Sequence, residues 1–197
     1  MTEDIFKFWG RLGDKFVHPD DVPILDRMSH DRHGFDLHCV PSNFFGKLKS
    51  APVILLFGSP GLSSEDLVNT SEVRARQREN FEGNLSVFSE HDHRSGWSWW
   101  RRVVRCFGDP ASLRDSVAVF NIGAYHSKAV NYGALSALPS SRMSVAYAQK
   151  VLFPAAEKEE RVVICLRAHA YWGITQGQEY KGYLFAPPVT RDRKSVV

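Results

Sequence analysis

Cysteine and long apolar runs are both scarce in this chain of 197 residues. The three cysteines, Cys39, Cys106 and Cys165, are odd in number and far apart, which favours buried thiols in a reducing compartment over a disulfide framework. No run of eighteen apolar residues is present, so no membrane-spanning helix is expected. The start, M-T-E-D-I-F-K-F-W, is acidic and aromatic, unlike a signal peptide. These features predict a cytoplasmic protein with no membrane partner.

The sequence also lacks internal repeats, low-complexity tracts and the glycine patterns of a P-loop or a dinucleotide-binding turn. With 43% hydrophobic residues, its length fits one domain with a substantial core. The formal net charge is +3, which permits nucleic-acid binding without requiring it. We expect a monomer.

Histidine gathers in two places, which raises the question of a metal site. The first group holds three histidines and a cysteine within ten residues, namely His30, His33, His38 and Cys39. Its spacing matches no zinc pattern, and no second cluster completes a set of four ligands. The second group, H-D-H at residues 91–93, lies in a polar stretch where solvated histidines are common, and it stays an alternative. The sequence therefore predicts neither a metal nor another cofactor.

The stretch 51–66, A-P-V-I-L-L-F-G-S-P-G-L-S-S-E-D, organises the rest of the chain. Residues 53–57 form an apolar run that predicts a strand buried on both faces. The turn 58–61 cannot continue that strand, because glycine favours positive φ and proline has no N–H. Ser63 as N-cap, with Asp66 three residues later, predicts an imperfect capping box and a helix start. Such a corner suits anions, although a tight strand-to-helix connection is the alternative interpretation.

Two further buried strands are predicted at 116–120 and 161–166, and a fourth strand at 182–187. Amphipathic helices are predicted at 97–107 and 142–160. Pro154 should kink or split the second helix. Residues 71–81 read as a solvated helix or a mobile segment. Because strands and helices alternate, we expect an α/β fold, a three-layer αβα sandwich with a central four-stranded, mostly parallel sheet. That domain covers 35–197, and residues 1–34 form an N-terminal arm that packs its aromatics on it.

Polar residues follow the predicted strands where parallel sheets bind ligands, at the carboxyl ends. Asn121 comes directly after the strand 116–120, and its amide can read an acceptor and a donor on a flat heterocycle. The same side chain can equally pin a turn. Tyr125, His126 and Ser127 follow in the same loop, and Arg167 and His169 follow the strand 161–166.

Four blocks in this order resemble the uracil-DNA glycosylase superfamily, in particular its uracil-glycosylase-like branch. They read L-L-F-G-S-P-G-L-S-S-E-D, W-S-W-W-R-R, V-A-V-F-N-I-G-A-Y-H-S and V-V-I-C-L-R-A-H-A-Y-W-G, and the resemblance covers roughly residues 35 to 190. It implies a four-stranded parallel sheet between helices. It also implies that the turn at 58–61 holds the water-activating loop and that Asn121 recognises the flipped base.

The chain departs from that family at two points. Ser59 stands where active members usually have Asp or Asn, and a hydroxyl cannot supply a carboxylate's charge to a cationic sugar. A-P-P-V-T-R-D follows the last strand in place of a His-Pro-Ser motif, and the cysteines do not fit an iron-sulfur cluster. For an active glycosylase, Ser59 would position water and His126 would polarise the leaving base, with His169 as the alternative histidine.

A glycosylase must also hold the flipped base and grip the backbone, and the sequence offers residues for both tasks. The base would lie among Gly58, Pro60, Gly61, Asn121 and Tyr125, and phosphates would be held by Ser63, Ser64, Ser127, Lys128 and Arg167. The predicted function is binding of DNA or a nucleobase-containing ligand, with hydrolysis of an N-glycosidic bond and a role in DNA repair. Two rivals remain: a catalytically inactive binding module on the same fold, and a protein-binding surface built from the five tryptophans, Trp9, Trp97, Trp99, Trp100 and Trp172.

Overall fold

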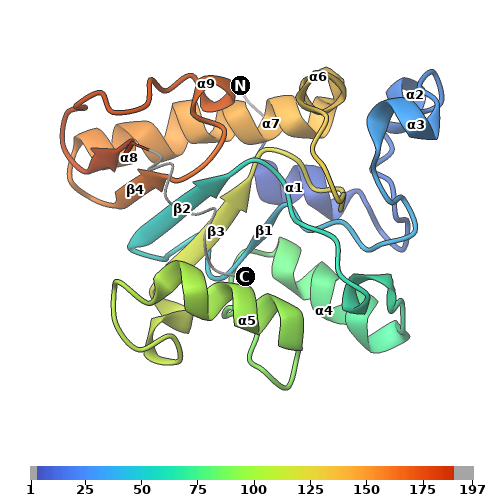
Figure 1. Ribbon diagram of the computed structural model, residues 1–197, viewed down its shortest axis with the longest axis horizontal. Helices are drawn as coiled ribbons and strands as arrows, with labels where there is room; N and C mark the ends of the chain where they lie inside the picture. The colour runs from blue at the N-terminus through green and yellow to red at the C-terminus, as the bar shows by residue number, and fades with distance from the viewer. Residues whose placement is uncertain (1–3, 189–197) are drawn as a thin grey trace, which may run out of the picture.

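A mixed five-stranded sheet forms the centre of the computed structural model, which describes residues 4–188 (Figure 1). The strand order is β1-β3-β2-β4-β5. Four strands run parallel to their neighbours: β2 (Val53–Phe57), β3 (Val117–Asn121), β4 (Val162–Cys165) and β5 (Leu184–Phe185). The α/β class is as predicted, but the sheet has one strand more than expected. That strand, β1 (Phe44–Phe45), pairs antiparallel with β3 and is too short to show a periodicity in the sequence.

Alternation along the strands divides the core between the two faces of the sheet. Leu55 and Val119 point to one face, where they pack with Trp100 and Val104 of α5 (Arg94–Val104). Ile54, Leu56, Ala118 and Phe120 point to the other face and join a larger cluster. Helices therefore lie on both sides of the sheet, with α5 on one side and α7 and α8 on the other (Figure 1).

The predicted long helix is divided around Pro154. The structure has α7 (Pro139–Tyr147), a π-helical turn at Ala148–Leu152 and α8 (Phe153–Glu157), with helical backbone angles at both junctions. A π turn is wider than an α turn, so it accommodates a proline that donates no hydrogen bond and would otherwise crowd the preceding turn. Pro154 therefore changes the winding of the helix without ending it.

The N-terminal residues belong to the main core. They form α1 (Ile5–Gly10), α2 (Val22–Leu25) and α3 (His30–His33), and Ile5, Phe8, Trp9, Leu12 and Leu25 are buried in the larger cluster. The Trp9 ring stacks on Phe81 of α4 (Ser71–Phe81) with centroids 4.8 Å apart. Asp21, fully buried, accepts hydrogen bonds from the Tyr125 hydroxyl at 2.6 Å and the Ser140 N–H at 2.9 Å. The segment is thus tied to elements over a hundred residues away.

The prediction that a helix starts after Ser63 is wrong. The chain makes only a 3-10 turn, η1 (Glu65–Leu67), and the next helix, α4, starts at Ser71 with the Thr70 hydroxyl accepting from the Val73 N–H at 3.3 Å. Charged α4 confirms the helical alternative for residues 71–81. The remaining short elements are η2 (Ser112–Asp115), α6 (Tyr132–Ala137) and α9 (His169–Trp172).

Two of the three cysteines are buried as predicted. Burial raises the pKa of the Cys39 and Cys165 thiols to about 12. Cys106 contradicts the prediction, because it lies exposed just beyond the end of α5. None of the helices within residues 4–188 is long and apolar enough to cross a membrane.

Candidate functional site: a polar cleft at the carboxyl ends of β2 and β3

An open cavity of about 700 Å³ lies where β2 and β3 end. Its lining includes Ser59, Pro60 and Gly61 from the loop after β2, Asn121 and His126 from the end of β3 and beyond, and the start of α5. Four aromatic residues, Phe45, Phe57, Phe88 and Trp99, also line it. The Trp99 ring contacts Phe57 edge to face at 5.2 Å and Phe45 at 5.7 Å. The cleft therefore combines an aromatic surface with a polar one.

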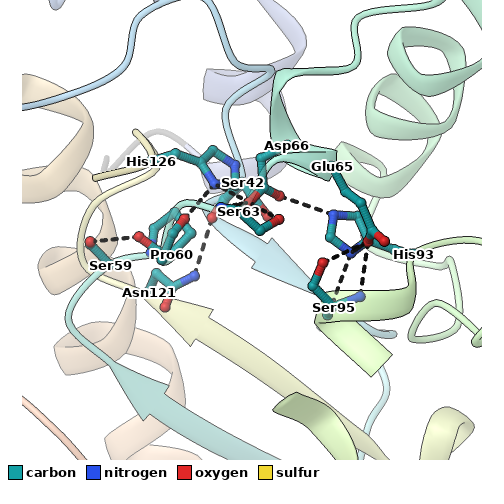
Figure 2. A network of polar contacts seen from close by, with 12 residues as sticks. Ser42, Ser59, Pro60, Ser63, Glu65, Asp66, His93, Ser95, Asn121 and His126 are labelled. Atoms are coloured by element: carbon teal, nitrogen blue, oxygen red, sulfur yellow. Dashed lines mark hydrogen bonds and ion pairs between the residues drawn. The ribbon is translucent and has the colours of Figure 1, made fainter. Parts of the chain in front are cut away.

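Asp66 is the centre of the polar surface (Figure 2). Its Oδ2 accepts hydrogen bonds from the Ser63 N–H at 2.6 Å and the Ser63 hydroxyl at 2.7 Å, so the predicted capping-box contact forms although no helix follows. His93 Nε2 lies 3.0 Å from Oδ1, and His126 Nδ1 lies 3.6 Å from Oδ2. Burial alone would raise the pKa of Asp66, but these donors outweigh it and lower the pKa to about 2. Asp66 is therefore anionic at neutral pH.

His93 connects Asp66 to the start of α5. Its Nδ1 accepts the Gly96 N–H at 2.9 Å, which caps the helix, and the same nitrogen lies 3.1 Å from Glu65 Oε2. One nitrogen cannot accept from an N–H and donate to a carboxylate at once. Neutral His93 therefore caps α5, whereas protonated His93 pairs with Glu65. The hydrogen bond to Asp66 and the charges of both carboxylates raise the pKa of His93 despite its burial.

Glu65 is itself anchored to the first turn of α5. Its Oε2 accepts the Ser95 N–H at 2.9 Å and the Ser95 hydroxyl at 2.7 Å, and these bonds lower the pKa of Glu65. Figure 2 shows His126, Asp66 and His93 in a row that ends at Glu65 and Ser95. Two segments nearly thirty residues apart, η1 and the N-terminus of α5, are thereby held together by hydrogen bonds to two carboxylates.

The Nε2 atom of His126 is available to a ligand or a water molecule, because only Nδ1 is engaged by the described part of the protein. Its Nδ1 lies 2.7 Å from the Gly61 carbonyl oxygen, which only accepts, so Nδ1 carries the proton. In neutral His126 the Nε2 lone pair is then left over, and within residues 4–188 it has no hydrogen-bond partner. The backbone carbonyl of His126 accepts the Asp36 N–H at 2.8 Å, which fixes the loop that carries the ring. The ring is therefore held in one tautomer beside an anion.

The side-chain amide of Asn121 has hydrogen-bonding groups that no protein atom among residues 4–188 occupies. One N–H of its Nδ2 donates to the Ser42 carbonyl at 3.1 Å, which leaves the other N–H and the amide oxygen for a ligand. Its own backbone carbonyl accepts from Asn43 Nδ2 at 2.8 Å. The turn-pinning and ligand-reading interpretations of the sequence are therefore compatible in this side chain.

The loop after β2 lines the cleft, but one of its hydrogen-bond donors already has a partner within the loop. The Ser59 hydroxyl donates to the carbonyl of Pro60 at 3.1 Å, so only its oxygen lone pairs remain for a water. Gly58 is buried behind this loop, and a Cβ there would lie 2.5 Å from the Tyr132 hydroxyl oxygen. Gly58 is thus required by packing against Tyr132, and it does not line the cleft as Pro60 and Gly61 do.

The structure contradicts the assignment of Tyr125 to the base. Its ring is fully buried and its hydroxyl donates to Asp21, so it fixes the N-terminal segment and does not line the cleft.

The phosphate-binding set is also not brought together. The Ser63 N–H is occupied by Asp66, and exposed Ser64 precedes only the 3-10 turn η1. Ser127 is buried outside the cleft lining, and Lys128 is exposed. Arg167 instead lines a separate open cavity of about 690 Å³, with His169 and the stacked rings of Tyr132 and Tyr171. The anion-binding corner predicted after β2 is therefore absent from its expected place.

Sequence reasoning missed the roles of Asp66, His93 and Glu65. Asp66 was predicted only as a capping residue, and H-D-H at 91–93 only as a metal alternative. Within residues 4–188 no group of three or more His, Cys, Asp or Glu side chains is placed to hold a metal ion. An acidic pair beside a buried strand and a histidine next to a helix start were the available signals, but nothing in their spacing indicates contact.

The tryptophans form no exposed patch. Trp9, Trp100 and Trp172 are buried, and Trp97 and Trp99 are half-buried. The protein-binding surface expected from them is therefore not observed.

Comparison of the chain with protein-family models, curated proteins and solved structures gave no match. The family resemblance thus stays a prediction, and the function is argued from the cleft.

Proposed function

We propose that this chain is a uracil-DNA glycosylase-like protein that binds a base of DNA in the cleft and hydrolyses its N-glycosidic bond. The observation that carries the proposal is the ionised carboxylate of Asp66, which lines the same cavity as His126, Asn121 and four aromatic residues. On this proposal the mixed sheet with helices on both sides corresponds to the family's three-layer αβα sandwich.

The cleft has the properties that base recognition requires. A flipped base is read at its edge by hydrogen bonds and held by stacking. Asn121 offers an acceptor oxygen and one N–H, and Phe57 and Trp99 offer ring surface. A volume of about 700 Å³ lies within the usual range for pockets that take small organic ligands, and it has room for a nucleotide.

The charges suit the cleavage step. As the glycosidic bond breaks, its electron pair leaves with the base and the sugar becomes cationic. A carboxylate with a pKa of about 2 is a poor proton acceptor but a persistent anion, so Asp66 supplies electrostatic stabilisation. Nε2 of neutral His126 can take a proton from the attacking water as its oxygen bonds to the sugar carbon. In this assignment Asp66 replaces the loop carboxylate that Ser59 lacks, and His126 acts on water instead of the leaving base.

The test is a base-release assay on single- and double-stranded DNA carrying uracil, hypoxanthine or a mismatch, read as strand cleavage after alkali. We expect Asp66→Asn to lower the rate by about 10²- to 10³-fold, as for loss of a charge-stabilising group. Asp31→Asn, an exposed acid on α3, is the matched control and should leave the rate unchanged. Equal rates for wild type and Asp66→Asn would remove Asp66 from the mechanism.

A second candidate is a module that binds the base without cutting. It is favoured by Ser59, whose hydroxyl is engaged by the Pro60 carbonyl, and by Asp66, whose two oxygens are already held by protein donors. This candidate predicts DNA binding that weakens steeply with salt and no product at any pH. Product formation that depends on Asp66 would exclude it.

A further inference from the structure

Four arginines stand unpaired along α5. Arg94, Arg101 and Arg102 lie within the helix and Arg105 is its C-cap, and all four are exposed. The helix contains no Asp or Glu, and within residues 4–188 none of these arginines has an ion pair or hydrogen bond. The situation differs on α4, where Arg76 pairs with Asp92 and Arg78 pairs with Asp14. Two of the three arginines on α4 are therefore paired with carboxylates, whereas in the described part of the chain no arginine on α5 is.

The spacing places three of these arginines in one row. Arg101 and Arg105 follow Arg94 by seven and eleven residues, which returns each of them to nearly the same side of an α-helix. At 1.5 Å per residue the row is about 16 Å long. Trp100 and Val104 bury another side of the helix against the sheet, so the row cannot turn inward.

The row begins at the cleft. Arg94 and Arg102 both line the cavity that Asp66 and Asn121 line, and His93, the N-cap of α5, donates to Asp66. Arg101 and Arg105 continue the positive charge away from the cavity without lining it. The helix thus joins the aromatic and anionic cleft to a basic surface formed by its exposed arginines.

We propose that α5 binds the phosphate backbone of the nucleic-acid strand whose base enters the cleft. This inference rests on the proposed function and adds to the cleft a second contact surface, on α5, for the backbone of the same strand. A guanidinium matches phosphate with two parallel hydrogen bonds, and it keeps its charge at all physiological pH values. A strand of a duplex carries about one phosphate per 3.4 Å of axis, so a row of about 16 Å reaches several phosphates.

The test compares two double charge reversals that change the net charge equally. Arg101→Glu/Arg105→Glu alters the row, and Arg27→Glu/Arg142→Glu alters exposed arginines elsewhere, after α2 and on α7. Binding of a fluorescent 20-mer single strand is measured by anisotropy over a range of salt, and binding of free 2′-deoxyuridine by calorimetry. Thermal melts check that both variants fold. If Arg101→Glu/Arg105→Glu does not fold, Arg101→Gln/Arg105→Gln takes its place.

We expect the α5 variant to bind the 20-mer at least tenfold more weakly at 50 mM salt, and the control less than threefold. The slope of log K against log salt should fall by about 1.4, since each lost phosphate contact on a single strand removes about 0.7. Binding of 2′-deoxyuridine should be unchanged, because Arg101 and Arg105 do not line the cleft.

Several outcomes would overturn the inference. These are equal losses in the two variants, no loss in either, and a wild-type protein that binds the 20-mer no better than 2′-deoxyuridine. Polyglutamate binding more tightly than the oligonucleotide would point to an acidic protein and would also overturn it. Failure of the proposed function looks different: Asp66→Asn would leave base release unchanged, or no base would be released, while the dependence of 20-mer binding on Arg101 and Arg105 persisted.

Discussion

At the scale of single residues, Nδ1 of His93 decides between two contacts. It caps α5 through the Gly96 N–H when His93 is neutral and pairs with Glu65 when His93 is protonated. Either way Nε2 donates to Asp66, so the carboxylate in the cleft keeps its partner. Protonation of His93 therefore replaces its capping contact with α5 by an ion pair with Glu65 of η1. Asp66 stays ionised in both states.

His93 should consequently stabilise the fold more in acid than in base. Its pKa is raised in the folded state, so the free energy it adds is fully present below its unfolded pKa of 6.5 and is lost as pH rises through the higher folded value. We expect His93→Gln to lower the free energy of unfolding more at pH 5.5 than at pH 8.5, measured by urea denaturation. His91→Gln, at an exposed position in the same loop, is the control. An equal or larger effect of His93→Gln at pH 8.5 would contradict the assignment.

Whether a contact could be predicted from the sequence depends on how many residues separate its two partners. The contact of Asp66 with Ser63 three residues earlier was readable, because capping has a fixed spacing. His93 and His126 lie 27 and 60 residues beyond Asp66, and no periodicity encodes such distances. Asn121 was readable because it ends a buried strand, whose side of the sheet is known from the parallel topology.

At the scale of elements, long apolar patterns were reliable and single capping signals were not. The strand 53–57 was predicted with the observed bounds, and α5 lies three residues earlier than expected. The capping signal at Ser63 gave only one 3-10 turn, because Asp66 turns back to Ser63 and outward to two histidines. β1 escaped notice because two residues, Phe44 and Phe45, show no alternation.

The loop after β2 packs against α6 through the contact of Gly58 with Tyr132. A Cβ at Gly58 would lie 2.5 Å from the Tyr132 hydroxyl oxygen, and the ring is held by stacking on Tyr171 at 4.3 Å. Gly58→Ala should cost about 1–3 kcal/mol of unfolding free energy through overpacking. Tyr132→Phe removes the oxygen and should restore part of this loss, although two ring carbons remain at 3.2 Å.

Gly61→Ala is the matched control, since a Cβ at Gly61 meets nothing within 4 Å. Urea denaturation of the wild type, Gly58→Ala, Tyr132→Phe and Gly58→Ala/Tyr132→Phe measures the coupling between the two positions. A loss in Gly58→Ala no greater than in Gly61→Ala would show that the loop moves away from α6 instead of straining against it.

At the scale of the whole molecule, the division at residue 34 does not correspond to a boundary of the core. The buried cluster that includes Phe120 and Leu56 also includes five side chains from the first 25 residues. The sequence indicated that this segment packs its aromatics, but composition could not indicate that Trp9 would stack on Phe81 or that Asp21 would meet Tyr125. Likewise, a net charge of +3 gave no sign that unpaired arginines gather on α5.

Deletion of residues 1–34 should therefore abolish cooperative unfolding. Each of the five buried apolar side chains contributes roughly 1.5–3 kcal/mol, and their sum rivals the 5–15 kcal/mol that holds an ordinary domain together. The truncated chain should show no sigmoidal urea transition by circular dichroism, whereas the full chain should show one. A cooperative transition in the truncated chain would identify residues 35–197 as an autonomous unit.

The ties of the N-terminal segment also bear on how the protein is made. Asp21 leaves the ribosome long before its partners, because Tyr125 follows it by 104 residues and Ser140 by 119. Phe8 and Trp9 are likewise made before β2 and α4, so the sheet and Phe81 cannot cover them until residues 53–57 and 71–81 have emerged. The nascent chain must therefore carry exposed aromatic side chains until those segments emerge, and this is the state in which chains aggregate or engage chaperones.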